Sequence, residues 1–217
     1  MPAAYSGCYG MKPTHGLVPY TGIMPIESTL DHAGPMTQNV ADNALMLEVI
    51  AGADGLDPRQ YNVVTDTYTR AVTAGASGLK IGIVKEGFGH ANSEADVDQK
   101  VRAAANILAE CGASVDEISV PWHLKGLPIW TPIASEGATN QMMHGNGMGT
   151  GWEGMYTTSL LDYHANWRGR ADELSDTLKI TMFVGQYFLK HHRGHYYAKA
   201  QNLSRQLREE YNKVLSS

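Results

Sequence analysis

The sequence has few cysteines, no long apolar run and no excess of positive charge, and each absence excludes a class of protein. Two cysteines in 217 residues, Cys8 and Cys111, are too few for a disulfide framework, so we expect both to be reduced, buried thiols. A net charge of −5 gives no general attraction to nucleic acid or to an acidic membrane. No signal peptide is visible and no run approaches about 18 apolar residues, so we expect a soluble, cytoplasmic protein.

The composition is that of a folded globular protein. Hydrophobic residues make up 43% of the chain and charged residues 18%, without the signature of disorder. Because no internal repeat and no clear linker is visible, we expect a single domain over residues 1–217 rather than two.

The N-terminal run 1–37 holds five of the nine prolines and five glycines, yet many of the residues between them are apolar. A rigid, apolar loop of this kind is usually held inside a larger structure and shapes a site there. Within it, residues 5–12 favour a short buried strand, and Asp31 is expected to accept hydrogen bonds from loop amides at a turn. Thr37 is the expected N-cap of a helix at about 38–51.

Two strands and a helix follow a polar segment, 53–78, that is typical of a surface excursion. Residues 79–85 predict a buried strand, Ser93 and Asp96 resemble a capping box, and Ser114–Val120 predict a second strand. The helix between them presents an apolar face and ends at Gly112. Strand, helix and strand within about 40 residues form a crossover unit, so the sheet is at least partly parallel.

The remainder of the chain is mainly helical in pattern. A helix is expected within 124–144, a glycine-rich break at 145–154, further helix over 158–192, and an amphipathic helix at 195–215. A sheet of two or three strands beside this many helices is incomplete.

The residues by themselves contain no complete catalytic set. His191 and His195 have a spacing compatible with a metal, but basic neighbours and the lack of an acidic partner favour solvated surface, so no metal site is expected. Ser135 and Glu136 are adjacent on a helix and do not face each other, which favours packing over nucleophilic chemistry. The turn at 87–89 lacks the glycine fingerprint of a nucleotide site. We therefore expect no cofactor.

Three blocks of sequence occur in a specific order in the N-terminal run. Met1-Pro2-Ala3 is followed by Gly10 to Val18, in the form Gly-x-Lys-Pro-Thr-x-Gly-x-Val, and then by Leu30 to Thr37, which runs into the helix with Asp42. In these blocks the chain resembles the amidase signature family, serine hydrolases that cleave carboxamides with a Ser–Ser–Lys triad. The similarity extends through the chain, most closely to the amidases that accompany nitrile hydratase, and includes Asp57-Pro58-Arg59-Gln60.

The resemblance implies an α/β fold, a partial α/β/α sandwich around a mixed sheet that is truncated at both ends. It implies hydrolysis of a monocarboxylic amide to an acid and ammonia through an acylated serine. Since Met1-Pro2-Ala3 matches only the tail of the nucleophile's segment, the triad and the oxyanion loop are expected upstream of Met1, and no residue here is assigned as catalytic. Leu30 and Trp130 are the expected substrate-binding residues, with core packing as the alternative for both.

The resulting hypothesis is an internal fragment of an amidase that is inactive by itself and whose partner is a small carboxamide. Two alternatives stay open: a catalytically dead amidase-like module that binds a partner, and an amidotransferase-type subunit that delivers ammonia to another active site. A homodimer also stays open.

Overall fold

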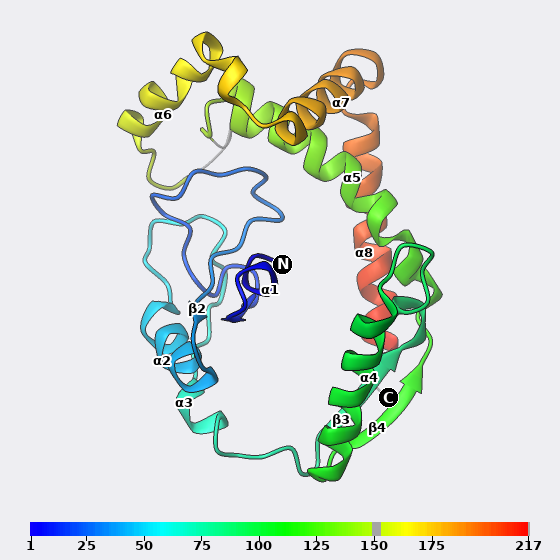
Figure 1. Cartoon of the computed structure of the whole chain (residues 1–217). Coiled ribbons are helices and arrows are strands. Elements are labelled where there is room, and N and C mark those ends of the chain that lie inside the picture. Colours follow the sequence, from blue (N-terminus) through cyan, green and yellow to red (C-terminus); the bar gives the residue numbers. More distant parts are fainter. Residues whose placement is uncertain (149–152, 217) are drawn as a thin grey trace. The chain divides into compact units, whose positions relative to one another are not determined.

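The computed structural model describes residues 1–148 and 153–216, and its regular structure is mainly helical (Figure 1). The chain divides into two compact units, each built from two stretches of sequence. The first combines Met1–Thr73 with Pro132–Tyr197, and the second combines Ala74–Thr131 with Ala198–Ser217. The single domain expected over the whole chain stays a prediction. The glycine-rich break expected at 145–154 lies partly outside the described residues.

Helices account for most of the elements in the first unit. It holds α1 (Pro2–Tyr5), β1 (Tyr9–Gly10), β2 (Met36–Thr37), α2 (Val40–Ile50), α3 (Tyr68–Ala71), a π-helix (Ala138–His144), α6 (Thr158–Ala165) and α7 (Asp176–His192). The second unit holds β3 (Lys80–Val84), α4 (Ala95–Glu110) and β4 (Ser114–Ile118), while α5 (Gly126–Gly137) and α8 (His195–Leu215) contribute residues to both. The helices expected near 38–51 and at 195–215 are confirmed.

The first unit contains a minimal antiparallel pair, in which Tyr9 of β1 lies opposite Thr37 of β2. The buried strand predicted over 5–12 is wrong, because only two of its residues pair and both are exposed. Thr37 is also not the N-cap of α2: the Asn39 side chain accepts the Asp42 amide, and the Thr37 hydroxyl donates to the Asn39 carbonyl. The buried Asn43 side chain then donates to Tyr9, Pro35 and Thr37, which ties the strands to α2.

A close helix contact organises the later part of the first unit. Ala138, Met142 and Met143 are buried, and partly buried side chains from residue 24 and from 167–182 pack around them. Helix α7 approaches this segment at Gly185, where an added Cβ would overlap the Ser135 carbonyl oxygen and the Thr139 hydroxyl. Glycine is therefore required at residue 185 by the distance between backbones, not by its φ angle.

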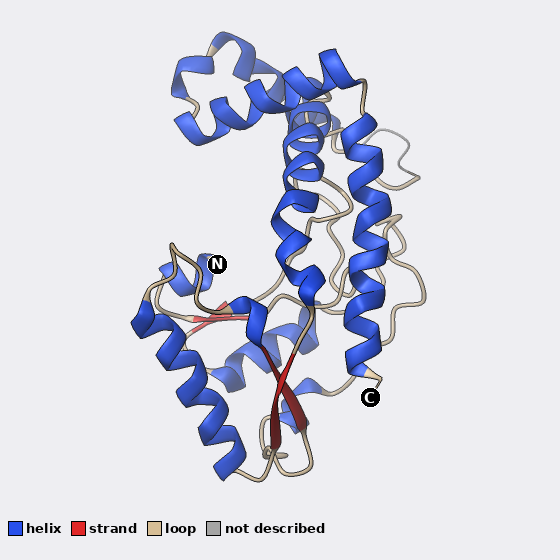
Figure 2. Ribbon diagram, turned by 90° about the vertical axis from the view of Figure 1, so that its right-hand side faces the viewer, coloured by secondary structure: helices blue, strands red, loops and turns tan. Residues whose placement is uncertain are grey.

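The second unit contains the predicted crossover, and its parallel sheet is confirmed (Figure 2). The register runs from Lys80 opposite Ser114 to Val84 opposite Ile118, with α4 as the connection. The predicted capping box is wrong: α4 has Glu94 as its N-cap with no side-chain cap, and the Ser93 hydroxyl donates to Asp98 instead.

The apolar surfaces of the second unit are less buried than the sequence pattern predicts. No residue of β3 is fully buried, and Ala105 is the buried residue of α4. Val97 and Val101, on the apolar face expected for α4, are both exposed. Cys111 is also exposed, while Cys8 is half-buried, so the prediction of two buried thiols is wrong.

Helix α8 is the longest helix among the described residues. Arg193 and Gly194 adopt left-handed φ angles of 54° and 73°, and this turn separates α8 from α7. Farther along α8, Tyr211 and His123 share a hydrogen bond of 2.5 Å between the phenol oxygen and Nδ1. None of the described helices is long and apolar enough to cross a membrane.

Candidate functional site

The candidate site is the loop of residues 20–35 in the first unit, where the sequence carries its family-like motifs. Asp31 is confirmed as the acceptor of this loop: its Oδ2 receives the Ile26 amide at 2.8 Å and the Glu27 amide at 3.1 Å. In return, the Leu30 and Asp31 amides both donate to the Glu27 carbonyl at 2.9 Å. The turn is therefore closed by backbone and side chain together, and Leu30 lies at its bend.

A second carboxyl group, that of Glu27, connects the loop to distant segments. Its Oε1 accepts the Tyr197 hydroxyl at 2.7 Å, and its Oε2 accepts the amide and the hydroxyl of Thr29. The Ser28 amide donates to the Gln141 side chain at 3.0 Å, which joins the loop to the π-helix. The sequence analysis did not predict Glu27 as a functional residue. The signal that could have indicated it was an acidic residue directly after the apolar run Ile23–Ile26.

A buried ion pair holds the other side of the loop. Arg59 Nη2 lies 2.8 Å from Asp57 Oδ2, and the two side chains are 9% and 0% exposed. Asp57 Oδ2 also accepts the Tyr20 amide at 2.8 Å, while Arg59 Nη1 donates to the Asp31 carbonyl at 3.2 Å. The Arg59 guanidinium stacks over the Tyr20 ring at 4.5 Å. The prediction of a surface excursion is therefore wrong at these residues.

The Asp57–Arg59 pair acts as a clamp on the loop, and Gln60 extends this clamp to the turns at Gly16 and Gly52. Its side-chain nitrogen donates to the Gly16 carbonyl at 2.9 Å and to the Gly52 carbonyl at 2.7 Å. The Gly52 amide in turn donates to the Leu17 carbonyl. The side chains of Asp57, Arg59 and Gln60 thus bind the N-terminal run at three points, which are Gly16, Tyr20 and Asp31.

The electrostatics of the loop follow from burial and hydrogen bonding. Burial raises the pKa of Asp31, against the opposing effect of its two amide donors. Burial also opposes the ionisation of Asp57, but the hydrogen bonds from Arg59 and the backbone outweigh it and hold the pKa of that carboxyl below its usual range. Burial lowers the pKa of His32, although its hydrogen bond to the Leu30 carbonyl opposes that shift. The clamp therefore favours an ionised Asp57 paired with Arg59.

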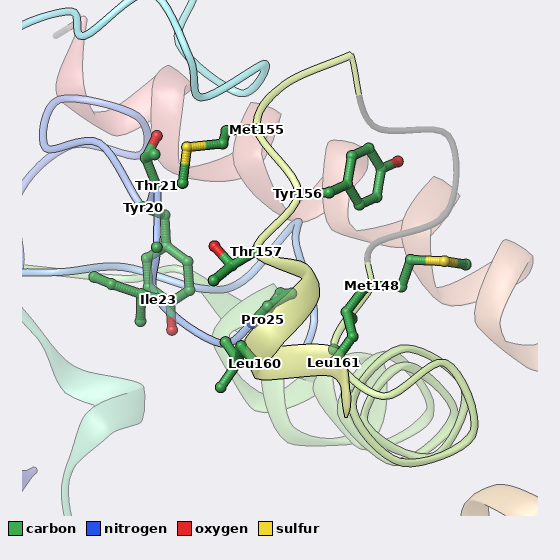
Figure 3. A pocket seen from close by; sticks show the side chains of 12 residues that line it. Tyr20, Thr21, Ile23, Pro25, Met148, Met155, Tyr156, Thr157, Leu160 and Leu161 are labelled. Atoms are coloured by element: carbon green, nitrogen blue, oxygen red, sulfur yellow. The ribbon is translucent and has the colours of Figure 1, made fainter. Parts of the chain in front are cut away.

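A small hollow lies beside the loop (Figure 3). Tyr20, Ile23 and Pro25 line it from the loop, and Leu160 and Leu161 line it from α6. Its volume is about 30 Å³, which is the room of one or two water molecules. A carboxamide substrate does not fit there, so the hollow is a packing feature of the unit.

The two predicted substrate-binding residues lie in different units. Leu30 is half-buried in the first unit, and Trp130 is 52% exposed in the second. Neither lines the hollow beside the loop. Their assignment to an acyl pocket stays a prediction.

The remaining candidate residues all lie in helices. Ser135 and Glu136 are both buried, as expected for packed helix residues. His191 belongs to α7 and His195 to α8, on either side of the left-handed turn. Within residues 1–148 and 153–216, no group of three His, Cys, Asp or Glu side chains is placed to hold a metal.

The whole chain has relatives among known proteins. The family model "Amidase" matches residues 1–217. The chain is 41% identical to an enantioselective amidase of Rhodococcus rhodochrous over 219 residues, covering 100% of this chain and 42% of the relative. It is 36% identical to one of the subunits of the glutamyl-tRNA(Gln) amidotransferase of Lysinibacillus sphaericus, covering 98% of this chain and 43% of that relative.

The fold has counterparts among solved structures. A bacterial aryl acylamidase of the amidase signature family aligns with a TM-score of 0.71 at 21% identity, over 99% of this chain and 41% of that one. The described architecture is thus a helix-rich α/β arrangement with a small parallel sheet, as in amidase signature structures. The chain belongs to the amidase family. It spans about two fifths of the length of the curated relatives that it matches.

Proposed function

We propose that this chain is the part of an amidase that follows the nucleophilic serine, in a whole protein that hydrolyses a monocarboxylic amide to an acid and ammonia. The proposal is supported by the family match over residues 1–217 and by the similarity to an enantioselective amidase. The Ser–Ser–Lys triad and the oxyanion loop are proposed to precede Met1. A cytoplasmic location and a link to nitrile breakdown belong to the same proposal.

The observation that carries this proposal is the double fixation of the loop 20–35. Asp31 holds the loop from within, Glu27 of the loop accepts the hydroxyl of the distant Tyr197, and the Asp57–Arg59 pair holds the loop from outside. A nucleophile and its oxyanion donors need a preorganised surrounding, because a displacement of about 1 Å reduces the rate strongly. We propose that the fixed loop gives this support to the segment that enters at Met1-Pro2-Ala3. Leu30 is proposed as a substrate-binding residue of this loop, and Trp130 is proposed separately as a substrate-binding residue of the second unit.

The test compares two purified proteins in an ammonia-release assay with acetamide and benzamide. The 217-residue chain by itself is expected to release no ammonia above a heat-treated control. The whole protein encoded by its own gene, extended at both ends and including the Gly-Gly-Ser segment and the preceding lysine, is expected to be active. Ammonia release by the 217-residue chain would refute the placement of the triad. An inactive extended protein that folds and carries all three triad residues would refute amide hydrolysis.

A second candidate function rests on the similarity to the amidotransferase relative. Here the whole protein would take ammonia from an amide and deliver it to a second active site on a partner protein. Glutamine discriminates between the two candidates: it is the expected substrate of an amidotransferase-type protein, and simple aliphatic and aromatic amides are expected for the amidase. A catalytically dead binding module would release ammonia from neither.

A further inference from the structure

Helix α7 carries a row of exposed side chains on the side opposite its close contact at Gly185. The members of this row are Asp176, Ile180, Phe183, Tyr187 and Lys190. Steps of four and three residues alternate along it, which is the spacing of the a and d positions of a coiled coil. Its three apolar members are 62%, 74% and 55% exposed, in chain order. An exposed apolar row with this spacing indicates a surface for packing against another helix.

The two ends of the row carry opposite charges. Asp176 begins α7 with a side chain that is 97% exposed, and Lys190 is exposed in the last turn. Lys179 lies 3.9 Å from the Asp176 carboxylate, which is a loose ion pair that leaves this carboxylate in solvent. Residues 177–189, between the two ends, include no acidic residue. The row is therefore acidic at its start, apolar in its middle and basic at its end.

Phe183 lies at the centre of this pattern. Asp176 comes seven residues before it and Lys190 seven residues after it, while Ile180 and Tyr187 lie three before and four after. When a second α7 packs on the row in the antiparallel direction, the two Phe183 side chains meet at the twofold axis. Asp176 of each copy then lies beside Lys190 of the other, and Ile180 lies beside Tyr187. The row is therefore complementary to itself in charge and in polarity.

We propose that the exposed row of α7 is a docking surface for α7 of a second copy of this protein, packed antiparallel about a twofold axis at Phe183. An anionic membrane and a nucleic acid match only the Lys190 end of the row, because both repel the Asp176 carboxylate. One pair of helices buries less than a standard interface of about 1,600 Å², so we expect a dissociation constant on the order of 10 μM. The inference does not depend on amidase activity.

The first experiment uses the whole protein encoded by its own gene, without substitutions, at about 100 μM. Labelled and unlabelled copies are mixed, treated with a carbodiimide that joins a lysine amine to a carboxylate in contact with it, and digested for mass spectrometry. We expect a link between Lys190 of one isotope and Asp176 of the other. Fourteen residues of α-helix hold these side chains about 21 Å apart within one copy, so the link can form only between copies.

Three outcomes of the first experiment would overturn the proposal. One is a monomer in which Lys190 and Asp176 form no link to a second copy. Another is a link from either residue to a segment of the whole protein outside residues 1–217, which would show that this segment covers the row. The third is a monomer that sediments with vesicles of anionic lipid, which would assign the row to a membrane.

The second experiment tests the charge pairing by sedimentation velocity of the same whole protein. Asp176→Lys brings two lysines together at each end of the interface, and Lys190→Asp brings two aspartates together. Each variant alone is therefore expected to dimerise about tenfold more weakly than wild type. An equimolar mixture of the two restores both pairs of opposite charge, so its heterodimer is expected to have the wild-type affinity. Glu110→Lys also reverses a charge, at an exposed residue of α4, and is expected to leave dimerisation unchanged. Single variants that dimerise as well as wild type, or a mixture no better than its components, would refute the antiparallel pairing.

Discussion

Removing the Arg59 side chain is the perturbation whose size the structure specifies best. Arg59→Ala deletes three contacts to Asp57, at 3.0 Å and 3.3 Å from Nε and 2.8 Å from Nη2, together with the 3.2 Å bond to the Asp31 carbonyl. It leaves the Asp57 side chain, which is 0% exposed, without its cation. Breaking a buried pair in this way costs about 3–5 kcal/mol, so we expect a loss of this size in the free energy of unfolding.

The assay is urea denaturation followed by tryptophan fluorescence and circular dichroism, with the double variant Asp57→Ala/Arg59→Ala beside each single one. The double variant is expected to be less destabilised than the sum of the single variants, because it leaves no unpaired charge. Arg170→Ala is the matched control: Arg170 and Glu173 also form a bidentate pair, but their side chains are 58% and 60% exposed, so little change is expected. A loss below about 1 kcal/mol for Arg59→Ala would refute the clamp.

Three further predictions concern the loop anchor, a close helix contact and a buried carboxyl group. Asp31→Ala removes the acceptor of two loop amides and is expected to cost about 1–3 kcal/mol by urea denaturation, with Asp31→Asn costing less; equal losses would contradict the role of the side-chain oxygen. Gly185→Ala places a Cβ against the Ser135 carbonyl and is expected to cost about 1–3 kcal/mol, whereas no loss would contradict the close approach of α7. Burial raises the pKa of Glu136 above 4.5, so its contribution to stability is largest below pH 4.5 and decreases as the pH rises toward the raised value; Glu136→Gln is expected to remove this decrease, and an unchanged pH profile would contradict it.

The sequence predicts the elements that depend on local pattern. The crossover of β3, α4 and β4 follows from apolar, β-branched strands on either side of an amphipathic helix, and its parallel register is confirmed. Helix α8 begins and ends where its pattern begins and ends. The capping residues are less predictable, because several polar side chains before a helix compete for the same amides: Asn39 caps α2 in place of Thr37.

Burial is the property that pattern predicts worst in this chain. Val97 and Val101 have the spacing of a buried helix face, yet both are exposed in the described structure. Periodicity reports which residues share a face, and it cannot report whether another element covers that face. The opposite error occurs at Asp57, which lies in a polar segment but is buried by its pairing with Arg59.

The candidate site was predictable only where its contacts are local. Asp31 binds amides four and five residues away, so a turn-forming aspartate was a sufficient signal. Tyr20 and Asp57 are 37 residues apart, and Tyr197 and Glu27 are 170 apart, so no window of sequence contains both partners. The Asp31 turn can form from the loop alone, but the orientation of that turn depends on partners that arrive only when the unit folds. The fixed conformation of the loop therefore depends on tertiary contacts. Substitutions at the distant residues that make these contacts are expected to cost more stability than the polar sequence around them indicates.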